Sequence, residues 1–362
     1  MNRAYRYLRL FRCANYGFSL PRGSMANYMK LRFGMYGKTV GSKGVHHPMM
    51  SILTVNRCNL KCSFCIYAGF PRDWETYELT PLKFQKILDL GIMKKCIIIC
   101  FTGGEALLNN DLPTLITMAR KRGHLTGMIT NGLLLKEKAE SIKEAGLNDA
   151  QVSIYDDTKE KLKTILPAVT SMFPLNASYV LLKSKLSEFS KNNFRDLMDT
   201  IEMCMNAGCA SIKFNLCEPT EENDNFDEAI LKGNAEYDAF VDLCLTTIKN
   251  VDFSGYKCRS SILPKKKFSI FFPNPVEANP NKRVCRIPWS VLRLDAEGNY
   301  GICCKLPASP GGPYGNVFRD SEDVINSPKT IEIKDCLINT DKPLVRECIK
   351  CINLNGSYSS RL

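Results

Sequence analysis

The chain has 362 residues, of which 44% are apolar and 24% are charged, and this balance excludes a disordered or fibrous protein. The longest strongly apolar run, residues 96–101, is far too short to cross the ~30 Å hydrocarbon layer of a bilayer. The net charge is +12, yet residues 1–44 contain nine Lys or Arg and no acid, so most of the excess positive charge lies there.

Residues 1–46 are predicted to form a basic N-terminal extension. Arg3, Arg6, Arg9 and Arg12 alternate with aromatic and aliphatic residues at helical spacing. We expect a helix that packs on the main domain with its arginines in water; contact with an anionic membrane surface or a phosphorylated partner is the alternative. The odd number of cysteines and the absence of a secretory signal pattern predict a cytoplasmic protein.

Residues 47–250 alternate β-branched runs with amphipathic stretches, which is typical of repeated βα units around a parallel sheet. Thr80 and Pro81 mark the start of the first long helix, as an N-cap followed by proline. Strands are predicted at 51–55, 96–101, 126–130, 151–154, 178–182 and 211–216. Later helices are predicted near 111–122, 135–145, 158–172, 192–207 and 227–249. The fold class is therefore α/β, with a partial (β/α)6 barrel similar to a TIM barrel.

A second part of the chain is expected after the barrel. Residues 251–282 include a segment rich in Pro, Asn and Lys, which indicates a linker or an excursion over the barrel surface. In residues 283–362, the runs 291–294 and 300–303 flank the turn 295–299 and predict a hairpin in a small, cysteine-rich α+β domain.

The first group of cysteines, Cys58, Cys62 and Cys65, follows the first strand with C-x3-C-x2-C spacing. In (β/α) barrels, the loops after the strands carry the chemistry. Three thiolates can bind three irons of a [4Fe–4S] cluster and leave the fourth iron open, whereas structural zinc usually has four protein ligands. Buried or zinc-binding cysteines are the alternative interpretation.

This cysteine group and a second motif, Gly103-Gly104-Glu105 after the second strand, resemble the radical S-adenosylmethionine (SAM) superfamily over residues 47–250. The resemblance implies that the open iron binds SAM and that the glycine–glutamate motif contacts its methionine amino group. It also implies cofactor or substrate contacts from other positions, namely Phe64, Asn131 and Ser153. At the end of the fifth strand the pattern departs from the family, because residues 183–185 are Lys-Ser-Lys.

The second group of cysteines lies near the C-terminus. The layout Cys285, Cys303, Cys348 and Cys351 resembles a twitch module, a short relative of SPASM domains, which implies an auxiliary [4Fe–4S] cluster with four thiolate ligands. Cys304 is the alternative to Cys303, because adjacent strand residues face opposite sides. A zinc ribbon is the competing interpretation.

The family resemblance implies reductive cleavage of SAM to a 5′-deoxyadenosyl radical that abstracts a substrate hydrogen. With an auxiliary cluster as electron acceptor, we expect a radical SAM oxidoreductase that dehydrogenates a small polar substrate such as a sugar or aminocyclitol. Cys217, just past the sixth strand, could instead return a hydrogen atom in an epimerisation, and Glu218 could bind substrate or remove a proton. Modification of a peptide is a further enzymatic alternative.

A radical SAM enzyme also needs a reductant, such as flavodoxin or ferredoxin. The alternative from another class is a zinc protein that binds nucleic acid through its basic N-terminus, with affinity that falls steeply with salt. The intact cysteine and Gly-Gly-Glu motifs argue against it, so no nucleic-acid partner is expected.

Overall fold

The computed structural model describes residues 49–67, 77–217, 226–249, 268–273, 285, 287–303, 314–320, 326–345, 348 and 359–360. The predictions made for residues 1–46 and for Glu218, Cys304 and Cys351 therefore lie outside the described residues.

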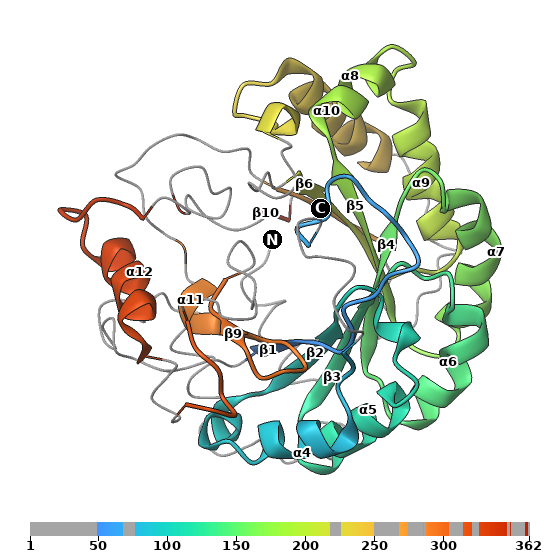
Figure 1. Ribbon diagram of the computed structural model, residues 1–362. Helices are drawn as coiled ribbons and strands as arrows, with labels where there is room; N and C mark the ends of the chain where they lie inside the picture. The colour runs from blue at the N-terminus through green and yellow to red at the C-terminus, as the bar shows by residue number, and fades with distance from the viewer. Residues whose placement is uncertain are drawn as a thin grey trace.

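The six predicted strands are present and form the curved sheet in Figure 1. They are β1 (Met49–Leu53), β2 (Ile98–Thr102), β3 (Leu125–Thr130), β4 (Asp149–Ile154), β5 (Leu175–Leu181) and β6 (Ser211–Leu216). Each pairs in parallel with the next in chain order. All their carboxyl ends therefore meet at one edge, from which the loops that carry chemistry leave.

Four further strands extend this sheet at both sides, so that it has ten strands in the order β10-β7-β6-β5-β4-β3-β2-β1-β8-β9 and does not close. β7 (Ser269–Phe272) pairs in parallel with β6, and β10 (Ser359–Ser360) pairs with β7. β8 (Val291–Leu294) pairs in parallel with β1, and β9 (Tyr300–Gly301) returns antiparallel to β8. The α/β class and the partial barrel are confirmed.

Two of these outer strands bear on the predicted ranges. β7 falls inside 251–282, where the sequence indicated a linker. The strand was not predicted because it has only four residues and its neighbours in the sequence are rich in Pro and Lys. The predicted C-terminal hairpin is β8–β9, and its turn is held by Asp295, whose carboxylate accepts hydrogen bonds from the backbone of Glu297 and Asn299, both at 2.9 Å. β8 continues the barrel sheet instead of starting another one.

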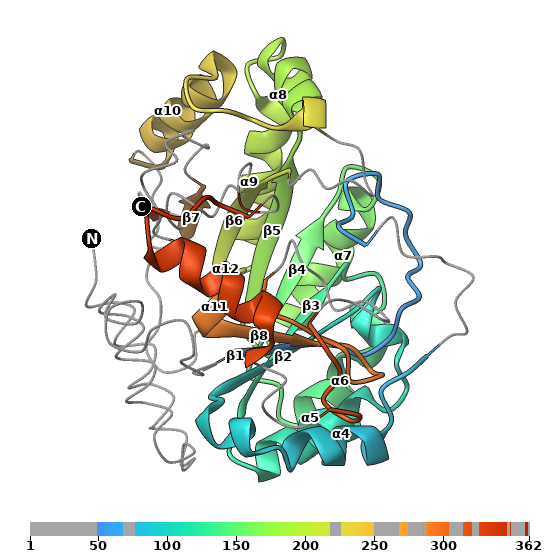
Figure 2. The same cartoon turned by 60° about the vertical axis from the view of Figure 1, so that its left-hand side comes forward.

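Helices cover the outer side of the sheet (Figure 1). In the barrel they are α4 (Pro81–Leu88), α5 (Leu112–Lys121), α6 (Leu135–Glu144), α7 (Lys159–Thr170), α8 (Lys183–Ser190), α9 (Arg195–Asn206) and α10 (Ala235–Lys249). Short 3-10 turns occupy η1 (Gly91–Lys95), η2 (Ala106–Leu108) and η3 (Phe226–Glu228). After the barrel, α11 (Ile287–Ser290) leads into β8, and α12 (Pro328–Ile338) contacts α11 (Figure 2).

The core lies between the strands and the helices. Alternate strand residues point outward and are fully buried beneath the helices, such as Ile99 and Phe101 on β2 and Val152 on β4. At the β6–β7 side, the Phe214 ring stacks on Phe272, with centroids 5.7 Å apart. This aromatic contact explains why β7 joins the sheet.

Two helical details differ from the sequence prediction. α8 was not predicted, and α9 begins at Arg195 because Asn193 and Phe194 have positive φ angles of 55° and 57°, which separate the two helices. The predicted N-cap of α4 is present, because the Thr80 hydroxyl accepts from the Lys83 backbone at 3.3 Å.

Candidate functional site

The candidate site lies at the carboxyl ends of the parallel strands, and its centre is the loop that follows β1. Cys58, Cys62 and Cys65 all lie on this loop. Backbone N–H groups point at two of their sulfurs: Leu60 donates to Cys58 Sγ and Tyr67 donates to Cys65 Sγ, both at 3.4 Å. Hydrogen bonds of this kind stabilise thiolates and tune iron–sulfur clusters.

The three thiols are close enough to affect one another electrostatically. Burial, together with the charges of Cys65 and Cys58, raises the pKa of Cys62 to about 11. Among the described residues, no three Cys, His, Asp or Glu side chains are arranged around a single metal ion. A cubane cluster sets each thiolate on a different iron, so one loop with mutually repelling thiolates fits such a cluster, whose positive irons would offset the repulsion.

The Gly-Gly-Glu loop after β2 is joined to the cysteine loop by backbone hydrogen bonds. Gly104 N–H donates to the Val55 carbonyl at 2.9 Å, and Glu105 N–H donates to the Arg57 carbonyl at 3.0 Å. A Cβ at Gly103 would overlap the Val55 carbonyl oxygen, and one at Gly104 would overlap that of Arg57. Both glycines are therefore required for the close approach of these two backbone segments.

Glu105 is 1% exposed, and its carboxylate accepts three hydrogen bonds from the protein. Oε1 accepts from Leu107 N at 3.0 Å and from Thr130 Oγ1 at 2.7 Å, and Oε2 accepts from Asn131 N at 2.7 Å. Burial raises its pKa above the ordinary value, although the three hydrogen bonds oppose this shift. The hydrogen bonds of Glu105 with Thr130 and Asn131 therefore connect the carboxyl end of β2 to that of β3.

Asn131 continues this connection to the cysteine loop. Its Nδ2 donates to Asn59 Oδ1 at 2.7 Å, and Asn59 lies directly after Cys58. Its Oδ1 accepts from Leu133 N at 3.1 Å. The motif after β2, the turn after β3 and the cysteine loop are thus linked by consecutive hydrogen bonds.

Phe64 packs against a residue that sequence reasoning did not select, Tyr155. The rings of Phe64 and Tyr155 have centroids 5.6 Å apart. Ser153 on β4 stands two residues before Tyr155, and its hydroxyl accepts from Ser178 Oγ at 3.4 Å. The charges of Cys62, Cys65 and Cys58 act on the Tyr155 phenol, so this side chain lies close to the cysteine loop. Burial raises the pKa of this phenol, so it carries its proton and can donate a hydrogen bond.

The residues at the departure from the family pattern belong to the start of α8. Lys183 is its first residue, Ser184 N donates to Glu228 Oε2 at 2.8 Å, and Lys185 Nζ lies 3.0 Å from Glu188 Oε2. The Ser184 backbone and the Lys185 charge therefore pair with acidic residues of η3 and α8.

Cys217 is fully buried immediately after β6, and its N–H donates to the Leu181 carbonyl at 3.0 Å. Alternation along the strand puts it on the same face as Lys213 and Asn215, which is the inner face of the sheet.

Of the C-terminal cysteines, Cys285, Cys303 and Cys348 are half-buried and pack against the core. The β8–β9 register pairs Leu294 with Tyr300, so the chain has returned to the amino end of β8 by Cys303. Cys285 lies just before α11, which leads into the same end of β8. Cys336, by contrast, is buried on α12, where its thiol donates to the Ile333 carbonyl at 3.2 Å.

The residues that the sequence analysis missed are Asn59, Thr130 and Tyr155. Thr130 and Tyr155 stand at or just past the ends of strands that were predicted, and Asn59 stands between two predicted ligands. Polar residues at strand ends were therefore the available signal, but their partners lie between 25 and 91 residues away in the sequence.

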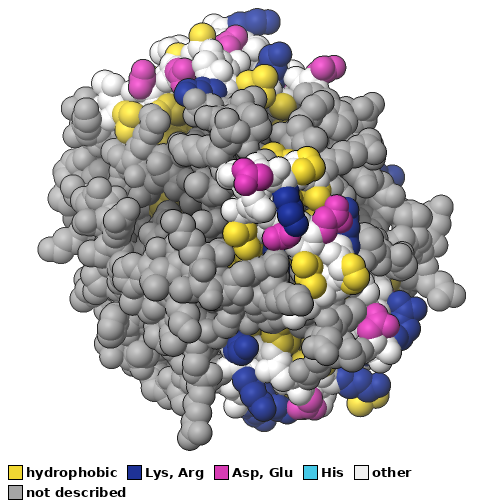
Figure 3. All heavy atoms as spheres, turned by 90° about the vertical axis from the view of Figure 1, so that its left-hand side faces the viewer, with side chains coloured by type: hydrophobic (Ala, Val, Ile, Leu, Met, Phe, Trp, Pro, Cys, Tyr) yellow, Lys and Arg dark blue, Asp and Glu magenta, His cyan; other side chains and the backbone are white. Residues whose placement is uncertain are grey.

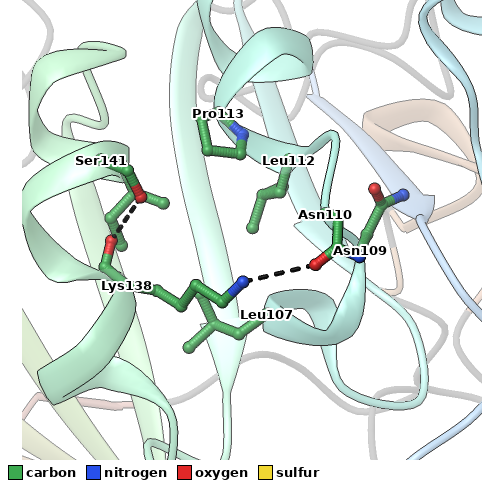
Figure 4. Close-up of a pocket in the computed structure, with 8 residues that line it drawn as sticks. Leu107, Asn109, Asn110, Leu112, Pro113, Lys138 and Ser141 are labelled. Carbon is green, nitrogen blue, oxygen red and sulfur yellow. Dashed lines mark hydrogen bonds between the residues drawn. The ribbon is translucent and has the colours of Figure 1, made fainter.

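A small cavity lies beside η2, between the start of α5 and α6 (Figure 4). Its volume is about 220 Å³, and Lys138 Nζ reaches across it to Asn110 Oδ1 at 3.4 Å. Its walls include the buried Leu112 and Ile142, so it belongs to the outer helical layer of the barrel.

The described residues carry charges of both signs. On the face in Figure 3, basic and acidic side chains of these residues are interspersed. Among the helices that the structure describes, none has the length and apolar character to cross a bilayer.

Comparison with curated proteins gives partial matches. The chain is 33% identical to the GTP 3′,8-cyclase of Aquifex aeolicus over 121 residues, which are 31% of this chain and 37% of that protein. It is 28% identical to the probable GTP 3′,8-cyclase of Methanocaldococcus jannaschii over 174 residues, which are 44% of this chain and 55% of that protein. The chain thus spans about half, or less, of the length of these relatives.

Solved structures agree in fold. Streptococcus suis SuiB bound to S-adenosylmethionine superposes with a TM-score of 0.59 at 13% identity, covering 89% of this chain and 74% of SuiB. The anSMEcpe structure with bound AdoMet gives 0.56 at 13% identity, covering 85% and 88%. Residues 52–232, half of the chain, match the Radical SAM superfamily, which implies a [4Fe–4S] cluster and SAM. The chain belongs to the radical SAM superfamily of enzymes.

Proposed function

We propose that the chain dehydrogenates a small polar, sugar-like substrate, with one [4Fe–4S] cluster at Cys58, Cys62 and Cys65 and a second at the C-terminal cysteines. When bound, the first cluster and SAM supply the radical chemistry that removes a substrate hydrogen atom. The second site, proposed at Cys285, Cys303, Cys348 and Cys351, would accept the remaining electron while a base takes the proton.

The observation that carries the substrate class is the polar inner face of the sheet. Interiors of closed (β/α) barrels are filled mainly by bulky branched apolar side chains. Here Ser153 on β4, Ser178 on β5 and Lys213 on β6 are aligned by strand register, with Gln151 and Asn176 paired one step below. Hydroxyl, amide and ammonium groups at matched heights suit a ligand that carries several hydroxyl or amino groups.

The course of the C-terminal segment supports an oxidation. Cys285 and Cys303 lie toward the amino end of β8, whereas Cys58 follows the carboxyl end of its neighbour β1. The four residues of β8 extend about 13 Å at ~3.3 Å per residue. A substrate against the polar inner face would then have the SAM site on one side and an electron acceptor on the other.

The chain's own residues would position the cofactor. We propose that the Gly103-Gly104 backbone and Phe64 contact SAM, with Asn131 and Ser153 as further contacts. Because Glu105 already accepts three hydrogen bonds from the protein, its contribution would be to hold that backbone in place. Glu218 remains the proposed base or substrate ligand.

The first test is metal analysis of anaerobically reconstituted protein. About eight irons with matching sulfide support two cubane clusters, whereas about four irons with one zinc would contradict the oxidation. Cys303→Ala and Cys304→Ala, analysed side by side, identify the ligand as the variant that loses about four irons.

The second test uses a panel of sugars and aminocyclitols in D2O, with 5′-deoxyadenosine and methionine measured together with the product. Dehydrogenation gives a ketone without deuterium at carbon. A redox-neutral product that contains solvent deuterium would refute it.

Epimerisation is the second candidate, because Cys217 shares the inner face with Lys213 and Asn215 at the carboxyl edge. A thiol there could return a hydrogen atom to a substrate radical, and that hydrogen exchanges with solvent. Loss of deuterium incorporation in Cys217→Ala, in an enzyme that incorporates it, would assign this role.

Two partner classes follow from the proposal. A flavodoxin or ferredoxin would supply electrons, and the substrate would be a small molecule, with a peptide as the alternative. The SuiB structure contains a bound precursor peptide, and its likeness to this chain concerns the fold alone. The same assay with peptides in place of sugars decides between the two.

A further inference from the structure

Two opposite charges stand in one row across the inner face of the sheet. The strands β8, β1, β2, β3 and β4 are neighbours in that order (Figure 2). Their register pairs Arg293 with Ser51, Ser51 with Cys100, Cys100 with Gly127 and Gly127 with Asp149. All five face the inside of the barrel, because the residues next to them in each strand are buried on the outer side of the sheet.

Arg293 forms the positive end of this row. It is 9% exposed, and its guanidinium carbon lies over the Tyr67 ring, 5.6 Å from the ring centroid. Tyr67 belongs to the cysteine loop, where its N–H donates to Cys65 Sγ. A guanidinium group that is already stacked on an aromatic ring is oriented for bidentate hydrogen bonds to a phosphate or carboxylate.

Asp149 forms the negative end of the row. It is the first residue of β4 and is half-buried. Gly127, its neighbour on β3, has no side chain, and a Cβ at that position would lie 3.2 Å from Asp149 Oδ1. The carboxylate therefore leans across β3 into space that a larger residue would fill. A carboxylate in this position accepts hydrogen bonds and suits an ammonium group.

Small, uncharged residues separate the two charges, namely Ser51, Cys100 and Gly127. Burial raises the pKa of the Cys100 thiol to about 12, and the charge of Asp149 adds to this rise while that of Arg293 opposes it. Both charges thus act on the middle of the row. Three strand spacings of ~4.8 Å separate Gly127 from Arg293, which is about 14 Å along the curved sheet and less in a straight line. A hexose with a charged substituent at each end matches this scale.

We propose that this row binds the substrate, which carries both an anionic group, held by Arg293, and a cationic amino group, held by Asp149. A sugar with one charge would lose one of the two charge-assisted contacts, and a neutral sugar would lose both. This inference deepens the proposed function and rests on it for the expectation that a sugar-like molecule enters the barrel.

The experiment is isothermal titration calorimetry of cluster-loaded protein, kept anaerobic and without reductant so that no turnover occurs. Four probes share one ring and differ in charge: glucose, glucosamine, glucose 6-phosphate and glucosamine 6-phosphate. We expect glucosamine 6-phosphate to bind about tenfold more tightly than either singly charged sugar, because each contact is a charge-assisted hydrogen bond. Similar affinities of all four sugars, or no binding of glucosamine 6-phosphate at millimolar concentration, would overturn the proposal.

Substitutions assign each end of the row. Arg293→Gln should weaken binding of the two phosphorylated sugars about tenfold, and Asp149→Asn should do so for the two amino sugars. The matched controls are Arg122→Gln and Asp89→Asn, which make the same changes in an exposed ion pair with a 2.6 Å contact. These controls should leave all four affinities unchanged. An equal loss for all four sugars in Arg293→Gln or Asp149→Asn would contradict the charge assignment.

Two further variants cover the case in which Arg293→Gln or Asp149→Asn does not retain iron. Arg293→Lys keeps the charge but lacks the planar fork, so it should weaken binding of the phosphorylated sugars. Gly127→Ala keeps both charges but displaces the Asp149 carboxylate, so it should weaken binding of the amino sugars. Unchanged affinities in both variants would then refute the proposal.

The binding data are independent of the oxidation. If glucosamine 6-phosphate binds with this charge preference but the enzyme proves redox-neutral, the proposed dehydrogenation fails and the charge assignment stands. If the enzyme oxidises a neutral sugar in preference to the doubly charged one, the dehydrogenation stands and the charge assignment fails.

Discussion

Glu105 offers the sharpest test of how the site is held together. Replacing it with Gln keeps the shape of the side chain but puts an NH2 group where one carboxylate oxygen accepted a hydrogen bond. If that group faces Asn131, two donors meet in a site that is 1% exposed. Leaving a buried donor without an acceptor costs about 1–3 kcal/mol. Glu105→Ala removes all three acceptor contacts and should destabilise the protein more than Glu105→Gln, by about 1–3 kcal/mol for each buried donor left without an acceptor.

The assay is urea unfolding under anaerobic, reducing conditions, followed by circular dichroism. Glu140→Gln is the matched control, because Glu140 is exposed on α6 and pairs with Lys143 at 3.2 Å. Exposed pairs of this kind contribute ~0–1 kcal/mol, so the control should stay close to the unsubstituted protein. If Glu105→Gln unfolds at the same urea concentration as Glu140→Gln, the hydrogen bonds of Glu105 to the end of β3 do not stabilise the fold.

The pH dependence gives a second readout for the same variant. Burial raises the pKa of Glu105, so the folded state holds the proton more tightly than the unfolded chain does. The stability that this provides is present below the unfolded pKa and is lost as the pH rises through the folded pKa. The Glu105→Gln variant cannot titrate at this position, so its free energy of unfolding should fall less as the pH rises over that range. A pH dependence equal to that of the unsubstituted protein would contradict the raised pKa of Glu105.

Gly104→Ala should prevent the two loops from docking, because its Cβ overlaps the Arg57 carbonyl, and iron bound per chain after reconstitution should fall to a small fraction. Cys62→Ala should abolish 5′-deoxyadenosine formation, and persistence of that product would remove Cys62 from the cluster. Cys303→Ala should lose about four of about eight irons. Cys336→Ala should lose none because that thiol bonds within its own helix, and equal iron loss in both would revise the ligand set.

Much of the barrel could be predicted because its strands carry apolar residues at the positions that are buried beneath the helices, in alternation with more exposed residues along β4. β6 begins and ends where predicted, and β5 begins three residues earlier than predicted, directly after Pro174. α8 was missed because its serines and lysines give weak helical periodicity. β7 was missed because four residues between Pro- and Lys-rich segments carry too little pattern to outweigh those neighbours.

At the site, the sequence could identify motifs but not the contacts between them. The cysteine spacing and the Gly-Gly-Glu motif are local, so they could be read from neighbouring letters. The bond from Asn131 to Asn59 joins residues 72 positions apart, and it depends on which strand ends become neighbours. The role of Glu105 as an internal acceptor likewise follows from burial, which a motif does not encode.

The position of β8 beside β1 has a consequence for how the chain is synthesised. β1 is made early but gains its second neighbour only when residues 291–294 have left the ribosome. At ~5–20 residues per second, this interval lasts roughly 10–50 s. During that time the edge of Met49–Leu53 lacks β8, the strand that pairs with it in the folded protein, and an open strand edge is a template for pairing with other chains. We therefore expect the yield of folded protein to depend on how well this edge is protected during synthesis, because the edge belongs to the strand that leads into the cysteine loop.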